Sequence, residues 1–503
     1  MNTVNGAHTL NTLDVPVTST YPFVKHVYVN LDLVDIISGK ALALLKSSVY
    51  STATFSIART VQFAFINNCS GSGECIEHEA VTENLALFIE TLMPMLPRLK
   101  TIRMIPGVGD DAIRNNIYAA FVQFVELMRS YNAQSSIEVN WPTHASQSPP
   151  IVVTGLSGIY VNNPKDVCVV QALIHKNATT LKSLSIAKTP PSTFINVFET
   201  SYGEAVAYPM LEKLTISGMS KAPKPKYSFE DSPILLPRLV DLSVKWGHPF
   251  HDDVLFRGNN ATLKRVILML DTEFMTILNK FKVFEESRLQ HAVLWNNPLG
   301  QGVRVEQGRL FCDIALSMAS KVPSLTLQGR FPAEAVVDEL TQRPANHNLR
   351  RLKLINSALS FGSLLALIQS LPNLNSIGIM KLTLEEAFSE MNPRTLLEHL
   401  HTSHYPLSSQ LQYVKCFAGN MGSLMENEAM CGMLLSLLCP KFTRLIVNDW
   451  LRKPYNRCIR KYIKTEPFIS CANRLGRLAF SDVGENNIKF KARPLGSFKK
   501  TNH

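Results

Sequence analysis

A short pattern of apolar residues recurs along the chain and limits the folds that the chain can adopt. An apolar anchor is followed by apolar residues at positions +3 and +5, as in Leu181-Lys-Ser-Leu184-Ser-Ile186. About sixteen anchors give a mean spacing of about 30 residues. Self-similarity at a period of about 20–50 residues is typical of solenoids, propellers and arrays. The anchors are Val24, Ala58, Leu99, a poor copy near Gln134, Leu156, Leu181, Leu211, Leu239, Leu263, Leu289, Val322, Leu349, Leu374, Leu411, Phe442 and Leu475.

Each repeat combines two periodicities. The residues at +3 and +5 alternate with mostly polar neighbours, which predicts a half-buried strand. Between anchors, apolar residues recur at helical spacing, and Leu85, Phe88, Ile89 and Leu92 would share one helix face. Leu-Pro pairs such as Leu96-Pro97 would end helices shortly before an anchor, because proline disfavours helix at the preceding residue. We expect helices over 39–48, 84–96, 115–128, 165–175, 272–281, 308–320, 333–342, 360–369 and 428–438.

One strand and one helix cannot bury both apolar faces alone, whereas stacked copies can. The sequence therefore predicts an α/β fold, an irregular solenoid with parallel strands on the concave face and helices on the convex face. We expect residues 1–20 to be disordered, 21–480 to form one solenoid, and 481–503 to form a frayed basic tail. A break between subarrays is expected near 142–150 or 219–233, where the chain has long loops.

Composition is that of an ordinary globular protein, with 46% hydrophobic and 18% charged residues. The formal net charge is +11, and the region from Cys439 onward holds 15 Lys and Arg against 4 Asp and Glu, so the basicity is C-terminal. The nine cysteines have no regular spacing, which favours a reducing compartment. Since neither a signal peptide nor a long apolar run is visible, we expect a cytoplasmic or nuclear protein with no membrane association.

The Leu-x-x-Leu-x-Leu segments with helices between them resemble the leucine-rich repeat, and their irregular spacing resembles the repeat region of fungal-type F-box/leucine-rich-repeat proteins. The resemblance implies recruitment of substrates to a ubiquitin ligase through a Skp-type adaptor. The family's F-box, which should precede the repeats, is not visible before Val24. The Asn or Cys that the family carries three residues after the last repeat leucine is also absent, so we expect irregular turns instead of an asparagine ladder.

Signatures of catalysis and of metal or cofactor binding are weak, and we expect a protein that is not an enzyme and holds no cofactor or metal. The chain has no Walker-type phosphate loop, and the glycines of Ser70-Gly-Ser-Gly73 precede Glu74, which would repel a phosphate. Cys69 and Cys75 have no second pair at zinc-finger spacing. His248, His251, Asp252 and Asp253 form the densest cluster of metal-ligand residue types, with His401 and His404 a weaker one, and we interpret both as solvated loops.

A basic stretch with interleaved aromatic residues, from Trp450 to Lys464, would follow the last complete strand as a helix. Cations in this arrangement can neutralise nucleic-acid phosphates. Terminal repeats, however, need a polar cap for solubility, and we favour the cap over nucleic-acid binding.

The residues at the outward-facing strand positions, +2 and +4, form a candidate surface for binding a partner. In the first half of the chain they hold mixed residues such as Thr101, Arg103, Ser183, Ser185, Lys213, Thr215, Asp241 and Ser243. In the second half they are basic with one aromatic residue, namely Arg351, Lys353, Tyr413, Lys415, Arg444 and Arg477. Arg and Tyr are enriched at binding hot spots, so an acidic protein segment is the expected ligand. The alternative is that these cations only discourage aggregation of exposed strands.

Three functions follow from these observations, and the first is preferred. It is a non-catalytic, monomeric interaction scaffold that binds a partner protein on the concave face. The second is a substrate-recognition subunit of a ubiquitin ligase, on the family resemblance alone. The third is nucleic-acid binding through the basic C-terminal helix.

Overall fold

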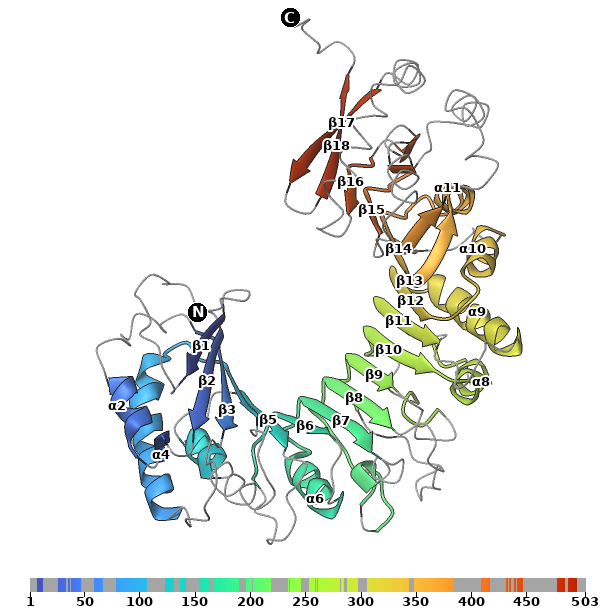
Figure 1. Ribbon diagram of the computed structural model, residues 1–503. Coiled ribbons are helices and arrows are strands. Elements are labelled where there is room, and N and C mark those ends of the chain that lie inside the picture. Colours follow the sequence, from blue (N-terminus) through green and yellow to red (C-terminus); the bar gives the residue numbers. More distant parts are fainter. Residues whose placement is uncertain are drawn as a thin grey trace, which may run out of the picture. The chain divides into compact units, whose positions relative to one another are not determined.

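The computed structural model contains helices and a large amount of parallel sheet, arranged in two compact units, Met1–Thr262 and Leu263–His503 (Figure 1). The α/β class expected from the sequence is confirmed. The loops at 142–150 and 219–233, where a break was expected, lie outside the described residues. The structure describes residues 7–11, 26–32, 35–36, 38–46, 58–66, 78–105, 123–130, 136–141, 153–162, 167–189, 196–200, 202–218, 234, 236–245, 253–257, 259, 261–280, 282–284, 287–296, 305–342, 348–383, 409–416, 431–432, 434–435, 438–439, 441–446, 477–484 and 487–494.

The first unit contains strands that pair in parallel and in sequence order, from β1 to β9. The strands are β1 (Ala7–Asn11), β2 (His26–Asp32), β3 (Thr60–Ile66), β4 (Thr101–Ile105), β5 (Ser136–Trp141), β6 (Gly158–Asn162), β7 (Ser183–Thr189), β8 (Lys213–Gly218) and β9 (Asp241–Lys245). Between them lie α2 (Lys40–Lys46), α4 (His78–Leu92), the short 3-10 helix η1 (Met93–Met95) and α6 (Val167–Asn177).

The second unit follows the same plan from β10 to β16, again with parallel pairing of successive strands. Helices α8 to α11 pack in sequence order, each against the next, and lie along one side of the strands (Figure 1). The elements are β10 (Arg265–Leu270), α8 (Thr272–Lys280), β11 (His291–Asn296), α9 (Val305–Ala319), β12 (Ser324–Gly329), α10 (Ala333–Gln342), β13 (Arg351–Ser360), α11 (Phe361–Ser370), β14 (Ser376–Thr383), β15 (Tyr413–Cys416) and β16 (Arg444–Ile446).

The recurring apolar pattern locates the strands accurately. Each strand from β2 to β17 begins two residues after an anchor. Where the structure describes the side chains, the residues at +3 and +5 are buried as predicted; Leu184 and Ile186 are 1% and 0% exposed. The residues at +2 and +4 lie on the opposite face of the sheet, because side chains alternate along a strand, and most of those described are half-buried or exposed. We call the surface formed by the +2 and +4 positions the open face.

Backbone hydrogen bonds repeat at the entry to the strands. The carbonyl of Lys182 accepts the N–H groups of Glu212 and Lys213, each at 2.9 Å. The carbonyl of Arg350 accepts those of Asn375 and Ser376 in the same way, at 2.8 and 3.1 Å. Neighbouring repeats are therefore held in register directly after the anchor.

Two buried asparagines also tie neighbouring repeats together, and we call them asparagine clamps. The Asn177 amide donates to the carbonyls of Val153 and Leu173 at 2.7 and 2.8 Å, and its oxygen accepts the Leu156 N–H at 2.8 Å. Asn259 uses the same geometry: it donates to Ile234 and Leu255 and accepts the Leu236 N–H. Both residues stand four positions before an anchor, and both are almost completely buried. These two asparagines link repeats on the helix side of the anchor, while the buried Asn296, the last residue of β11, links repeats at the end of the strand by donating to the Arg330 carbonyl.

Both ends of the chain differ from the expectation. Residues 7–11 of the segment expected to be disordered form β1, which pairs in parallel with β2. The expected frayed tail contains β18 (Asn487–Pro494), which pairs in antiparallel with both β16 and β17 (Arg477–Gly484). Alternation of apolar and basic residues along Ile488-Lys-Phe490-Lys is a strand signal that the sequence interpretation overlooked.

Candidate interaction surface

The structure brings five of the six sequence-predicted partner residues together on neighbouring strands of the second unit. Arg351, Tyr413 and Arg444 occupy one row, because Arg351 pairs with Ser376, Ser376 with Tyr413, and Tyr413 with Arg444. Neighbouring strands lie about 4.8 Å apart, so this row spans about 14 Å of backbone.

A second row runs parallel to the first. Lys353 pairs with Gly378, and Gly378 pairs with Lys415. Arg351, Lys353 and Arg444 are exposed, whereas Tyr413 and Lys415 are half-buried. Strand β14 adds only Ser376 and Gly378 to these rows, and both are buried. The cations of β13 and β15 therefore stand on either side of a strip of small residues.

Arg477 does not continue the first row. Strand β18 pairs with both β16 and β17 and thus lies between them, and Arg477 is paired with Pro494 in antiparallel register. The sequence pattern locates β17 but not the strand that separates it from β16. We therefore leave Arg477 out of the surface.

The open-face positions of the second unit carry cations and no carboxylate in the strands that the structure describes. Within the described strands β10 to β16, no Asp or Glu occupies a +2 or +4 position, while Arg265, Arg351, Lys353, Lys415 and Arg444 do. Arg351, Lys353 and Arg444 also have no ion pair with another residue in the described part of the chain. We call Arg351, Lys353, Tyr413, Lys415 and Arg444 the cationic patch.

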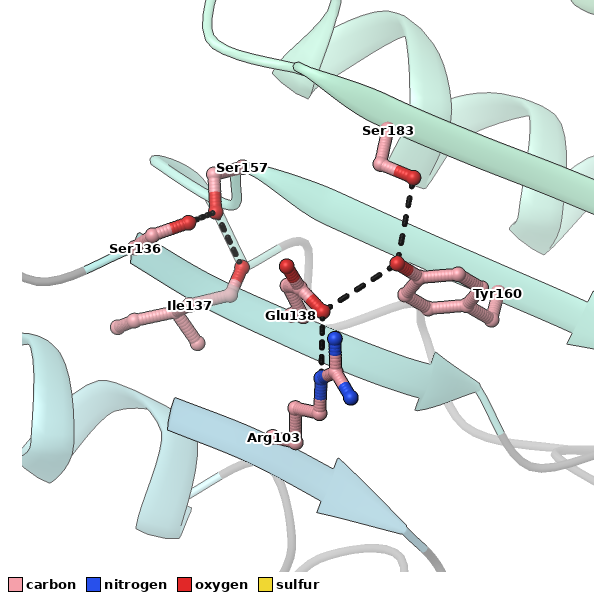
Figure 2. A network of polar contacts seen from close by, with 7 residues as sticks. All are labelled: Arg103, Ser136, Ile137, Glu138, Ser157, Tyr160 and Ser183. Atoms are coloured by element: carbon pink, nitrogen blue, oxygen red, sulfur yellow. Dashed lines mark hydrogen bonds and ion pairs between the residues drawn. The ribbon is translucent and has the colours of Figure 1, made fainter. Parts of the chain in front are cut away.

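The open face of the first unit is organised differently, around a polar network that crosses four strands. The Arg103 guanidinium donates to a Glu138 carboxylate oxygen at 2.9 Å. The Tyr160 hydroxyl donates to the same oxygen at 3.3 Å and lies 3.2 Å from the Ser183 hydroxyl oxygen. Figure 2 shows these side chains aligned across β4, β5, β6 and β7. The shared carboxylate neutralises the one cation of the network.

Gly158 makes space for this network. It pairs with Glu138 in the parallel register, and a Cβ at Gly158 would lie only 2.8 Å from the Glu138 Cγ. The Glu138 side chain therefore leans over the neighbouring strand toward Tyr160. Burial is the main cause that raises the pKa of Tyr160, while its hydrogen bond with Ser183 lowers the pKa by a smaller amount.

Opposite charges share register positions along the first unit. Its +2 and +4 positions from β2 to β9 hold two cations and two carboxylates within the described strands. Arg103 is paired directly opposite Glu138, and Lys213 directly opposite Asp241. The sequence named Arg103, Lys213 and Asp241 as outward-facing but missed the pairings, because the poor anchor near Gln134 was not used to place Glu138. Each open-face cation of the first unit thus has a carboxylate at its register position on the next strand, whereas the described open-face positions of the second unit hold no carboxylate.

Several candidates from the sequence lie outside the described residues. These are the cysteine and glycine cluster at 69–75, the histidines at 248, 251, 401 and 404, and the basic stretch from Trp450 to Lys464. Asp253 is described, and it forms an ion pair with Arg257 at 2.9 Å. Within the described ranges, no group of His, Cys, Asp and Glu side chains could hold a metal ion. No helix in that part of the chain is both long and apolar enough to cross a bilayer.

No family model matches this chain, and no curated protein sequence matches it.

Proposed function

We propose that this protein is a non-catalytic interaction scaffold, an irregular α/β solenoid that binds an acidic partner protein on the open face of the second unit. The observation that carries the proposal is the charge of Arg351, Lys353 and Arg444, which are exposed and have no ion pair within the described residues. The same repeat in the first unit places a carboxylate opposite each open-face cation, so the repeat itself does not require free cations there. Electrostatic complementarity raises the association rate and selects among partners.

Protection against aggregation is a weaker explanation of the patch. Cations serve that purpose on edge strands, whose backbone groups are unpaired. Strands β13 and β15, however, are paired on both sides, β13 with β12 and β14, and β15 with β14 and β16. Arg351, Lys353 and Lys415 therefore stand inside the sheet, where no unpaired backbone needs protection.

Affinity capture from cell extract tests the proposal with two double variants. Arg351→Glu with Lys353→Glu reverses two exposed charges of the cationic patch. Arg288→Glu with Arg309→Glu makes the same change in net charge at exposed positions of the second unit that are not on the open face. We expect a partner protein that the wild type and the Arg288/Arg309 variant recover and the Arg351/Lys353 variant loses. Equal recovery by all three proteins would refute the proposal.

A further inference from the structure

The cationic patch has an apolar neighbour on the same open face. Along the +4 row, Ile267 pairs with Val293, Val293 with Thr326, and Thr326 with Lys353. Ile267 and Val293 are only half-buried, although the +3 and +5 side chains beside them are buried. One continuous row therefore changes from branched aliphatic side chains on β10 and β11 to lysines on β13 and β15.

An indole extends the apolar end of this row. Trp295 is the next outward residue along β11 and is half-buried. Gly329 lies beside it, and a Cβ at Gly329 would come within 3.0 Å of the Trp295 ring carbon Cδ1. The missing side chain lets the indole lie close to the backbone of β12. Ile267, Val293 and Trp295 form what we call the apolar patch.

We infer that the acidic partner binds through a segment with separate apolar and acidic parts, the apolar part on the apolar patch and the acidic part on Arg351 and Lys353. This inference rests on the proposed function and specifies the partner's chemistry. Apolar and aromatic contacts next to arginine are typical of interface centres, and apolar surface that water leaves on binding supplies affinity that exposed charges alone do not.

The distance between the apolar patch and the cationic patch determines how long the partner's segment must be. Val293 and Lys353 are two strands apart, about 10 Å, which an extended chain spans in about three residues. The full row from Ile267 to Lys415 crosses five strand spacings, about 24 Å, which corresponds to about seven extended residues. A segment of about ten residues with an apolar block and an acidic block can therefore contact both patches.

A single-stranded nucleic acid is the competing ligand for a surface with cations and apolar side chains. Nucleic-acid sites of this kind use several aromatic rings on which successive bases stack. Ile267 and Val293 are aliphatic, and they suit apolar peptide side chains better than bases.

Fluorescence anisotropy with labelled synthetic peptides tests the inference on the full chain. Two peptides of about ten residues carry a Leu/Phe block and a Glu block in either order, a third has the same composition with the two types alternating, and a fourth contains only Glu in its acidic part and Ser elsewhere. A single-stranded oligonucleotide serves as the nucleic-acid probe. Far-UV circular dichroism verifies that each variant is folded.

We expect at least one block peptide to bind more tightly than the alternating and Glu/Ser peptides. The change Ile267→Thr with Val293→Thr keeps the branched shape and should weaken block-peptide binding about tenfold, with no effect on the Glu/Ser peptide. Arg351→Glu with Lys353→Glu should weaken every acidic peptide by more than tenfold.

Block peptides that bind no better than the Glu/Ser peptide, or whose binding does not respond to the Ile267/Val293 variant, would overturn the inference. The proposed function would survive that result if the Glu/Ser peptide still depended on Arg351 and Lys353. If the acidic peptides bind the Arg351/Lys353 variant as tightly as the wild type, both the inference and the proposed function are overturned. Tighter binding of the oligonucleotide than of any peptide, lost in the same variant, would assign the surface to nucleic acid.

Discussion

The asparagine clamp at Asn177 gives the sharpest test of how neighbouring repeats are joined. Asn177→Ala removes three hydrogen bonds, from the side-chain amide to two carbonyls and from the Leu156 N–H to the side-chain oxygen. Each such bond contributes about 1 kcal/mol net, so the free energy of unfolding should fall by about 3 kcal/mol. The cost rises toward about 5 kcal/mol if the stranded Leu156 N–H and Val153 carbonyl stay buried without partners.

Hydrogen exchange followed by mass spectrometry is the suitable assay, because repeat arrays can open in parts and not as one unit. Peptides that contain Leu156 should exchange about a hundredfold faster in the variant, as 3 kcal/mol corresponds to roughly two factors of ten. Asn162→Ala is the matched control, since Asn162 is exposed and its side chain has no hydrogen bond within the described residues. Surface changes of this kind alter stability by less than about 0.5 kcal/mol. Equal exchange rates of the Leu156 peptides in the two variants would refute the stabilising role of the Asn177 clamp.

Two further predictions concern Tyr160 and Gly329. The pKa of Tyr160 is raised in the folded protein, so the neutral Tyr160 side chain contributes stability below the unfolded pKa of about 10, and this contribution is lost as the pH rises above that value. Denaturation curves should therefore show the wild type losing stability relative to Tyr160→Phe above about pH 10. A stability difference between the two proteins that does not change with pH would contradict this. Gly329→Ala should destabilise the protein by more than about 1 kcal/mol, because φ is +98° and the new Cβ would lie 2.0 Å from the Asn296 carbonyl oxygen. Gly39→Ala, at φ +70° with open space around it, isolates the backbone contribution, and equal thermal shifts for the two glycines would rule out the clash.

The strands were predictable because local sequence determines them. An anchor followed by two apolar residues at +3 and +5 marks each strand from β2 to β17, including the poor copy near Gln134. Helix α10 spans Ala333–Gln342, the range that its apolar spacing predicted. The buried strip of α4, including Leu85 and Phe88, was likewise predicted from helical periodicity.

Features that depend on pairing between distant segments were harder to predict. The sequence placed Arg477 on the cationic row, because nothing local indicates that β18 lies between β16 and β17. The asparagine clamps were missed for another reason: asparagine was sought after the strand, as in the leucine-rich repeat. The sequences Asn177-Ala-Thr-Thr-Leu181 and Asn259-Asn-Ala-Thr-Leu263 share an Asn four residues before the anchor, and this shared spacing was the available signal.

Placement of a photo-crosslinking amino acid at residue 353 tests the central claim most directly. Lys353 is exposed on the open face within the cationic patch, and Arg309 is exposed on α9 and serves as the control position. Irradiation in cells, followed by mass spectrometry, should give a protein adduct from position 353 whose crosslinked peptide is acidic, and no such adduct from position 309. The same adducts from both positions, or none from position 353, would contradict a partner-binding role for the open face.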